Sequence, residues 1–165
     1  MSESLLIIGA GGHGQVVKEV AEALGYGKIA FLDDNSAEAI GKIVDSKSFV
    51  QEYQAAFVGI GNNKFRNELL KRLEQDGYEI PALLHPTAYI SKTAAIGKGT
   101  VVEPKAIVNA NSRVGVGCII SVGAIVDHDV VLEDCVHVNA GAICKAGSFV
   151  AKETKLEAGQ VVKGY

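Results

Sequence analysis

Two histidines in the C-terminal half of the chain have neighbours that suit acid–base chemistry. His128 lies between Asp127 and Asp129, and His137 follows nine residues later. A carboxylate beside an imidazole orients the ring and raises its basicity, which suits a general base with an ordinary pKa of about 6.5. An exposed histidine at a corner of the chain would have the same neighbours, so the motif alone leaves that alternative open.

A second candidate site begins at a glycine-rich segment near the N-terminus. An apolar run over residues 4–8 ends in Gly9-Ala10-Gly11-Gly12-His13-Gly14, and a helical pattern of Val16, Val17, Val20 and Leu24 follows. Glycines between a strand and a helix let the chain turn sharply and expose backbone amides, which form a natural phosphate site. The segment therefore predicts a strand, a phosphate-binding loop and a helix.

Two further strand ends are expected at the same edge. The predicted strand over residues 28–32 ends in Asp33 and Asp34, where a ribose-binding acid belongs. The predicted strand over residues 55–60 ends in Gly61 and Asn62, and Asn62 could cap a helix that carries Phe65, Leu69 and Leu73. We expect this edge to bind a nucleotide through Gly11, Gly12, His13, Gly14, Asp33, Asp34, Gly61 and Asn62, with Arg66 nearby.

These elements describe a Rossmann-like half domain over residues 1–84. About eighty residues give room for one mononucleotide but not for the second half that a dinucleotide spans. Residues 80–84 are predicted to close the small sheet, and residues 85–89 to form an extended linker because Pro86 disfavours helix before it. His85 in that linker is interpreted as structural. The alternative is a domain that only packs against the rest of the chain.

The remaining residues, 90–165, form a repeat. Every sixth residue is aliphatic except Cys144, and a mostly small residue follows four positions after each. The thirteen positions are Ile90, Ile96, Val102, Val108, Val114, Ile120, Val126, Leu132, Val138, Cys144, Val150, Leu156 and Val162. Such a short period predicts a solenoid in which each repeat buries its apolar face against its neighbours. Three strands and corners make a triangular coil of eighteen residues, so about four coils are expected.

The coil geometry separates the two histidines. His128 and His137 lie about half a perimeter apart, so one chain cannot bring both to one substrate, whereas neighbouring chains could. On one side of the prism the outward residues are Ile107, Ile125, Ile143 and Val161, here called the aliphatic column. Such a column is expected to be covered from water. It predicts a subunit interface and a closed homotrimer.

Composition limits the remaining classes. A formal charge of -3 argues against a nucleic-acid or membrane-surface binder. The N-terminus shows neither a basic n-region nor a long apolar run, so neither a signal peptide nor a membrane span is expected. The cysteines are odd in number and form no CxxC pair, and Cys118 and Cys144 occupy inward repeat positions. We therefore expect thiols in a reducing cytoplasm and no metal site.

The repeat resembles that of the hexapeptide acyltransferases, whose coils form an all-β left-handed parallel β-helix. Nearly the whole chain is similar to bacterial sugar acetyltransferases, which include UDP-4-amino-sugar N-acetyltransferases and sialic acid O-acetyltransferases. The matching segments are Ile8 to Gly14, Phe31 to Asp34, Ile60 to Asn63 with Arg66, His85 to Ala88, Val126 to Asp129, and Val136 to Val138.

This resemblance implies a trimer that uses acetyl-CoA, with the active site between subunits. By position, His128 matches the catalytic base and Asp129 the acid that polarises it. His137 matches the histidine that contacts the acetyl group or its carrier. Backbone amides near Ala146 and Gly147 match the region that meets the thioester carbonyl, and His13 with Asp33 and Asp34 matches the nucleotide-sugar site.

Two departures from the family pattern bear on function. Ser121 stands where many relatives carry an asparagine close to the base. Relatives usually continue for further coils that help to grip the coenzyme, whereas this sequence ends at Tyr165, which predicts altered CoA binding. The expected function is acetylation of a nucleotide-linked amino sugar. The alternatives are O-acetylation of a sialic acid or another sugar, and a non-catalytic nucleotide-sugar-binding protein.

Overall fold

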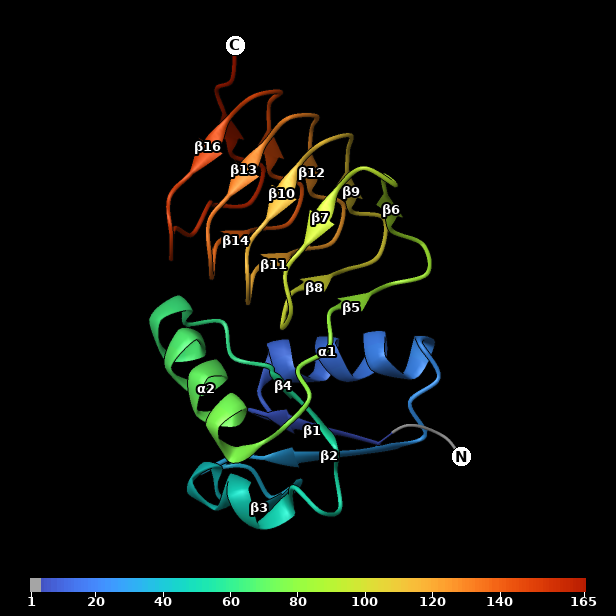
Figure 1. The fold of residues 1–165 in the computed structure, drawn as a ribbon, viewed down its shortest axis with the longest axis vertical. Helices are drawn as coiled ribbons and strands as arrows, with labels where there is room; N and C mark the ends of the chain where they lie inside the picture. Colours follow the sequence, from blue (N-terminus) through green and yellow to red (C-terminus); the bar gives the residue numbers. More distant parts are fainter. Residues whose placement is uncertain (1–3) are drawn as a thin grey trace.

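A computed structural model describes residues 4–165, so the first three residues of the predicted N-terminal domain lie outside it. An α/β part and a prism of short strands are stacked along the long axis of the molecule (Figure 1). The C-terminus lies at the far end of the prism. Within the described residues no helix is both long and apolar enough to cross a bilayer.

The α/β part is built on a parallel sheet with strand order β3-β2-β1-β4. Its elements are β1 (Ser4–Ile8), α1 (Gly12–Ala23), β2 (Lys28–Leu32), β3 (Ala39–Gly41), the 3-10 helix η1 (Ile43–Phe49), β4 (Ala55–Val58) and α2 (Asn63–Asp76). The predicted strands at residues 4–8 and 28–32 are confirmed. The third predicted strand ends two residues early, at Val58.

The two helices begin and pack differently. Gly11 caps α1 without a side-chain hydrogen bond, whereas the Asn62 side chain accepts one from the Phe65 amide and caps α2 as predicted. Gly14 must be glycine, because a Cβ there would lie 2.0 Å from the Gly9 carbonyl oxygen. The apolar patterns predicted part of the buried face of α1 and of α2 wrongly. Leu24 and Phe65 are exposed, and their places in the core are taken by Ala21 in α1 and Leu70 in α2.

The prism consists of two-residue strands in three parallel sheets, each strand pairing with the one eighteen residues away. The junction sheet contains β5 (Leu83–Leu84), β8 (Val101–Val102), β11 (Ile119–Ile120) and β14 (His137–Val138). The outer sheet contains β6 (Tyr89–Ile90), β9 (Ile107–Val108), β12 (Ile125–Val126), β15 (Ile143–Cys144) and β17 (Val161–Val162). The third sheet contains β7 (Ala95–Ile96), β10 (Arg113–Val114), β13 (Val131–Leu132) and β16 (Phe149–Val150).

The six-residue repeat forms the core of this prism as predicted. All thirteen repeat positions line it, and the four-residue offset series supplies small buried side chains such as Ala106 and Ala124. Polar members of that series bond to the backbone of neighbouring corners. Thr100, for example, donates to the Gly115 carbonyl at 2.9 Å and accepts from the Cys118 amide. The Thr100 hydroxyl is thus paired inside the coil, whereas the buried Ser148 hydroxyl of the same series has no partner among the described residues.

The prediction that residues 80–84 close the small sheet is wrong. Leu83 and Leu84 pair with Val101 and Val102, so they form the first strand of the prism. Glu79 pairs with the small sheet through an isolated bridge to Ala55. The following turn, assigned above to a linker, is the first corner of the first coil. There the His85 ring accepts a hydrogen bond from the Thr87 amide.

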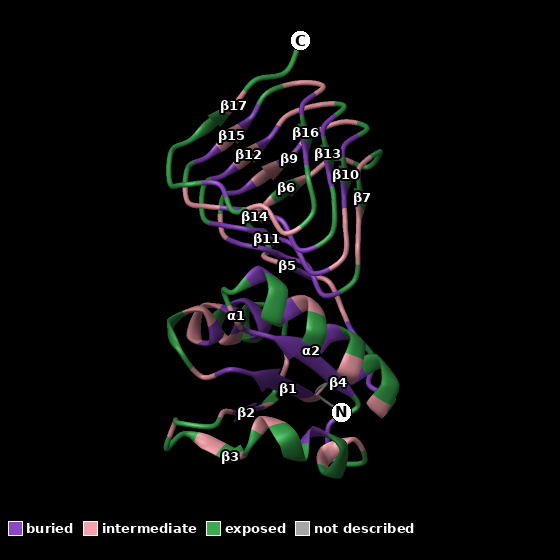
Figure 2. Cartoon of the chain, turned by 90° about the vertical axis from the view of Figure 1, so that its left-hand side faces the viewer, coloured by how far each residue is buried: buried purple, intermediate pink, exposed green. Residues whose placement is uncertain are grey.

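The two parts share a buried junction, in which the junction sheet rests on α1 and α2 (Figure 2). Outward residues Leu83, Val101 and Ile119 of that sheet pack with Leu5 and Val17 of the α/β part. Cys135, which the repeat does not place inside a coil, is buried here against α2. The chain therefore folds around a continuous apolar contact, not two domains on a free linker.

Arg66 is buried inside this junction, and it also contacts the strand end at Gly61. Its side chain is 1% exposed. Nε donates to the Gly117 carbonyl at 2.7 Å, and Nη2 donates to the Cys135 carbonyl at 3.0 Å and to Asn63 Oδ1 at 2.6 Å. Nη1 donates to the carbonyls of Ile60 and Gly61. One guanidinium thus joins α2 to two coil corners.

Candidate active site

His128 stands at the corner that follows β12, and its ring pairs with Asp129. Its Nδ1 lies 2.7 Å from Asp129 Oδ2, and the His128 amide donates to Asp127 Oδ1, also at 2.7 Å. Asparagines of the preceding coil hold both acids, since Asn109 donates to Asp127 and Asn111 donates to Asp129. The acid–imidazole pair expected from the sequence is therefore present and braced by the coil below.

The electrostatics of this pair suit a base. The hydrogen bond to Asp129 raises the pKa of His128, and the charge of Asp127 adds to it. The hydrogen bond from His128 is also the main cause that lowers the pKa of Asp129. Because an ionised carboxylate can only accept, Nδ1 carries the proton of the neutral ring, and in that form Nε2 keeps its lone pair. The side chain is 44% exposed, so Nε2 is open to a substrate.

One coil further on, the two candidate amides differ in availability. The Gly147 amide donates to the His128 carbonyl at 3.0 Å, so it is already engaged. One coil earlier, the Asp127 side chain accepts a hydrogen bond from the amide of the following residue, His128. Lys145 occupies the position equivalent to Asp127 before Ala146, and its side chain cannot accept a hydrogen bond. Within residues 4–165 the Ala146 amide has no protein acceptor. Of the two, Ala146 is therefore the free donor beside His128.

Tyr165 is a neighbour of this site that the sequence did not indicate. Its hydroxyl donates to Asp129 Oδ2 at 3.3 Å, and its ring centroid lies 6.3 Å from that of His128. A Cβ on Gly147 would lie 2.0 Å from the Tyr165 ring, so only glycine allows this contact. Tyr165 falls outside the six-residue pattern, and no motif marks it.

His137 lies on the junction sheet, away from His128, as the spacing predicted for a single chain. Its Nε2 is 3.1 Å from the Ser121 hydroxyl, and its Nδ1 is buried without a partner among the described residues. Burial, followed by the charge of Arg66, lowers the pKa of His137 to about 4. Ser121, expected close to the base, thus bonds to His137 in its own chain.

His13 also lies at the junction, on the first turn of α1. Its Nδ1 is 3.8 Å from Glu103 Oε1, and its Nε2 is buried without a partner among residues 4–165. Burial, followed by the charge of Arg66, lowers the pKa of His13 to about 4. The sequence placed His13 beside Asp33 and Asp34. The structure instead places it against Glu103 of the prism, which no motif singled out.

The structure brings only some of the other residues predicted to bind the nucleotide into contact with one another. Asp33 accepts hydrogen bonds from the amides of Ala10, Asn35 and Ser36, so it holds the glycine loop to the end of β2. The bond from Ala10 is the main cause that lowers the pKa of Asp33. Asp34 accepts from the Ile43 amide and is otherwise exposed. Gly11 and Gly12 are exposed, with open space where a Cβ would stand.

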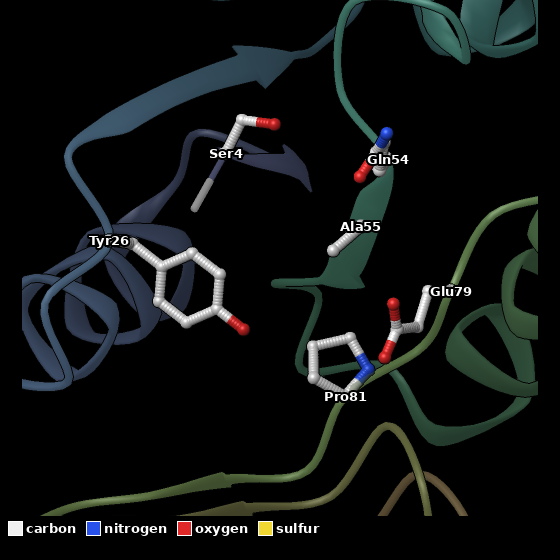
Figure 3. A pocket seen from close by; sticks show the side chains of 6 residues that line it. All are labelled: Ser4, Tyr26, Gln54, Ala55, Glu79 and Pro81. Carbon is white, nitrogen blue, oxygen red and sulfur yellow. The ribbon is translucent and has the colours of Figure 1, made fainter. Parts of the chain in front are cut away.

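Two cavities lie near these elements. One of about 420 Å³ is lined by Gly61, Asn62, Asn63 and Lys64 of the α2 start and by Glu153 and Lys155 of the prism. The other, of about 110 Å³, lies at the opposite ends of the strands and is lined by Ser4, Tyr26, Gln54, Ala55, Glu79 and Pro81 (Figure 3). Only the first contains residues predicted for the site.

The cysteines take no part in this site. Cys118, Cys135 and Cys144 are buried free thiols, and burial raises the pKa of Cys118 to about 12 and that of Cys144 to about 11. Such thiols are poor nucleophiles. In the part of the chain that the structure describes, no group of three or more histidine, cysteine or acidic side chains is arranged to hold a metal ion.

Comparison with known proteins identifies the family. Residues 4–73 match the PglD N-terminal domain. The acetyltransferase domain of PglB from Neisseria gonorrhoeae, solved with acetyl coenzyme A, is 37% identical, with a TM-score of 0.93 over 99% of this chain and 83% of that one. The chain belongs to the bacterial sugar acetyltransferases. The predicted fold class, a Rossmann-like half domain followed by a hexapeptide-repeat β-helix, is confirmed.

Two further members of this family are similar. Perosamine N-acetyltransferase from Caulobacter crescentus, solved with CoA and GDP-perosamine, is 26% identical with a TM-score of 0.90 over 98% of this chain and 89% of that one. UDP-N-acetylbacillosamine N-acetyltransferase from Bacillus subtilis (strain 168) is 30% identical over 111 residues, or 61% of this chain. This chain spans about half, 51%, of the length of that curated relative.

Proposed function

We propose that this protein transfers an acetyl group from acetyl-CoA to the amino group of a nucleotide-linked sugar. The observation that carries the proposal is the His128–Asp129 pair at 2.7 Å, on an imidazole side chain that is 44% exposed. The named activities of the two N-acetyltransferase relatives, and the acetyl coenzyme A bound to the PglB domain, support the same reaction.

His128 and the neighbouring corner supply the proposed chemistry. His128 Nε2 removes a proton from the sugar amine as the nitrogen attacks the acetyl carbonyl carbon. The negative charge that develops on the carbonyl oxygen is stabilised by the Ala146 amide, since a fixed backbone donor favours the transition state. The C–S bond then breaks, CoA leaves as the thiolate, and the proton held on His128 is available to it. His137 contacts the acetyl group or its carrier.

The nucleotide end of the substrate is proposed to bind at the start of α1. The exposed glycines Gly11 and Gly12 open the N-terminus of this twelve-residue helix, where no side-chain cap occupies the first amides. Such a terminus favours a phosphate. Gly14 allows the close approach of helix and strand, Asp33 holds the loop, and Asp34 keeps a carboxylate oxygen for the ribose. Gly61 and Asn62 line the adjacent cavity.

We infer a cyclic homotrimer in a reducing cytoplasm. The aliphatic column runs straight up the outer sheet, because Ile107, Ile125, Ile143 and Val161 are in register. Tyr89 extends it by one strand and is 58% exposed. A second chain against this column would cover it and bring its own junction residues towards His128. The three buried free thiols fit the reducing compartment.

The test is CoA-thiol release from acetyl-CoA with and without a UDP- or GDP-linked amino sugar. We expect sugar-dependent release by the wild type and a loss of at least a hundredfold in His128→Ala, with unchanged sugar affinity. His85→Ala, a histidine of the first corner, is the matched control and should keep its activity. Release with a hydroxyl acceptor alone would favour O-acetylation. Sugar binding without release and without acetyl-CoA binding would favour the binding protein.

A further inference from the structure

Glu103 is a buried carboxylate without an assigned role. It follows β8 on the junction sheet, and the residue is 6% exposed. Its Oε2 accepts a hydrogen bond from the Val122 amide at 2.9 Å, and its Oε1 faces His13 Nδ1 at 3.8 Å. One carboxylate therefore connects a coil corner of the prism to the first turn of α1.

The position of Glu103 favours one tautomer of the His13 ring. The ring is neutral near pH 7, because burial and Arg66 lower its pKa to about 4. A neutral imidazole has one N–H and one lone pair. Burial raises the pKa of Glu103, and the Val122 amide counteracts this by donating to Oε2. In the ionised form of the carboxylate, Oε1 presents negative charge to Nδ1. A lone pair on Nδ1 would be repelled there, whereas an N–H is attracted.

We propose that Glu103 is a positioning residue that holds His13 as the Nδ1–H tautomer, so that Nε2 accepts a hydrogen bond from the sugar. Nε2 is buried and has no partner among the described residues. An acceptor of this kind selects an O–H or a neutral N–H. It does not select a phosphate, which at neutral pH offers mainly acceptors. The inference rests on the proposed function and assigns His13 to the sugar moiety instead of the diphosphate.

A second orphan nitrogen lies on the same sheet. Ser121 lies one coil above Glu103, and its hydroxyl bonds to His137 Nε2, which leaves Nδ1 of that ring buried and unpaired within residues 4–165. A positive charge on His13 would lower the pKa of His137, so the two rings lie within electrostatic range. Two unpaired nitrogens at the junction favour two polar contacts to the bound substrates, to the sugar at His13 and to the acetyl group or its carrier at His137.

The tautomer can be read directly from the protein without substrate. In long-range ¹H–¹⁵N spectra of ¹⁵N-histidine-labelled protein, with His13 assigned by His13→Gln, we expect a protonated Nδ1 and an unprotonated Nε2. In Glu103→Gln, the amide oxygen keeps the Val122 bond and the NH₂ faces Nδ1, so the proton should move to Nε2. A wild-type His13 with its proton on Nε2 would overturn the proposal, whether or not the variant folds.

Glu133→Gln is the matched control. Glu133 accepts from the amide nineteen residues later, that of Lys152, as Glu103 does from Val122. Among residues 4–165 it forms no ion pair with a histidine. In CoA-release kinetics, Glu103→Gln should raise the KM for the nucleotide sugar about tenfold, leave the KM for acetyl-CoA unchanged and spare the Glu133→Gln control. Equal KM values in Glu103→Gln and wild type would refute the sugar contact. Absence of turnover in wild type would refute the proposed function and leave the tautomer result standing.

Discussion

Two half-buried histidines, His13 and His137, make the stability of the fold depend on pH. His13 and His137 both have a pKa of about 4 in the folded chain, against 6.5 for an ordinary histidine. The unfolded chain therefore binds these protons below pH 6.5, whereas the folded chain excludes them until about pH 4. Stability should fall as the pH is lowered through that window, because protons favour the state that binds them.

The magnitude follows from the two pKa values. Between pH 7 and pH 5, a shift from 6.5 to about 4 removes roughly 2 kcal/mol for each histidine. The pair thus removes up to about 4 kcal/mol, a large part of the 5–15 kcal/mol that typically stabilises a domain. Glu103 acts in the opposite direction, because burial raises its pKa and its protonation on acidification favours the folded chain.

The assay is urea unfolding at pH 7 and pH 5, at one protein concentration, for the wild type and for His13→Gln combined with His137→Gln. The double variant should lose far less stability between the two pH values than the wild type does. His128→Gln is the control, because its exposed ring has a raised pKa and should not reduce the wild-type loss. An equal loss in the double variant and the wild type would refute this account of the junction.

Three further changes test the base, the junction and the interface. Asp129→Asn should move the midpoint of the kcat/KM–pH profile to lower pH, because the hydrogen bond to Asp129 is the main cause that raises the pKa of His128; an unmoved midpoint would contradict the assigned pair. Arg66→Met should cost about 3 kcal/mol or more in urea unfolding, since it leaves the buried carbonyls of two coil corners unpaired; a cost below 1 kcal/mol would argue against the clamp. Ile125→Asp, in the aliphatic column, should sediment as a monomer, whereas Val131→Asp on the third sheet should not; a trimeric Ile125→Asp would place the interface elsewhere.

The repeat was the most predictable feature, because each position that points into the prism core carries an apolar residue that can be recognised in the sequence. The six-residue period also includes Leu84, which lies six residues before Ile90. Ala88, four residues after Leu84, belongs to the small offset series, and both residues pack against the prism core. The signal for an earlier first coil was thus present. It was outweighed by the expectation that a short apolar run after α2 would return to the small sheet.

The junction was the least predictable feature. A helical pattern shows that one face of α2 is apolar, but not that Leu70 rather than Phe65 reaches the core. Nor does a pattern of residue types show that Arg66 is buried, because a charged side chain normally stays in water. Its burial depends on carbonyls contributed by coil corners about fifty and seventy residues away. Such acceptors are set by the tertiary structure alone.

This junction explains how a half domain can serve a site on a β-helix. The outward residues of the junction sheet are buried against α1, and Arg66 fixes α2 to the same corners, so the glycine loop has a defined distance from the coils. A nucleotide held at α1 would then present its sugar at His13. Because His128 stands on another corner, the sugar bound by one chain would meet the base of its neighbour. The buried Arg66 side chain and the aliphatic column would therefore both set the separation between sugar and base across the boundary between the subunits of the proposed trimer.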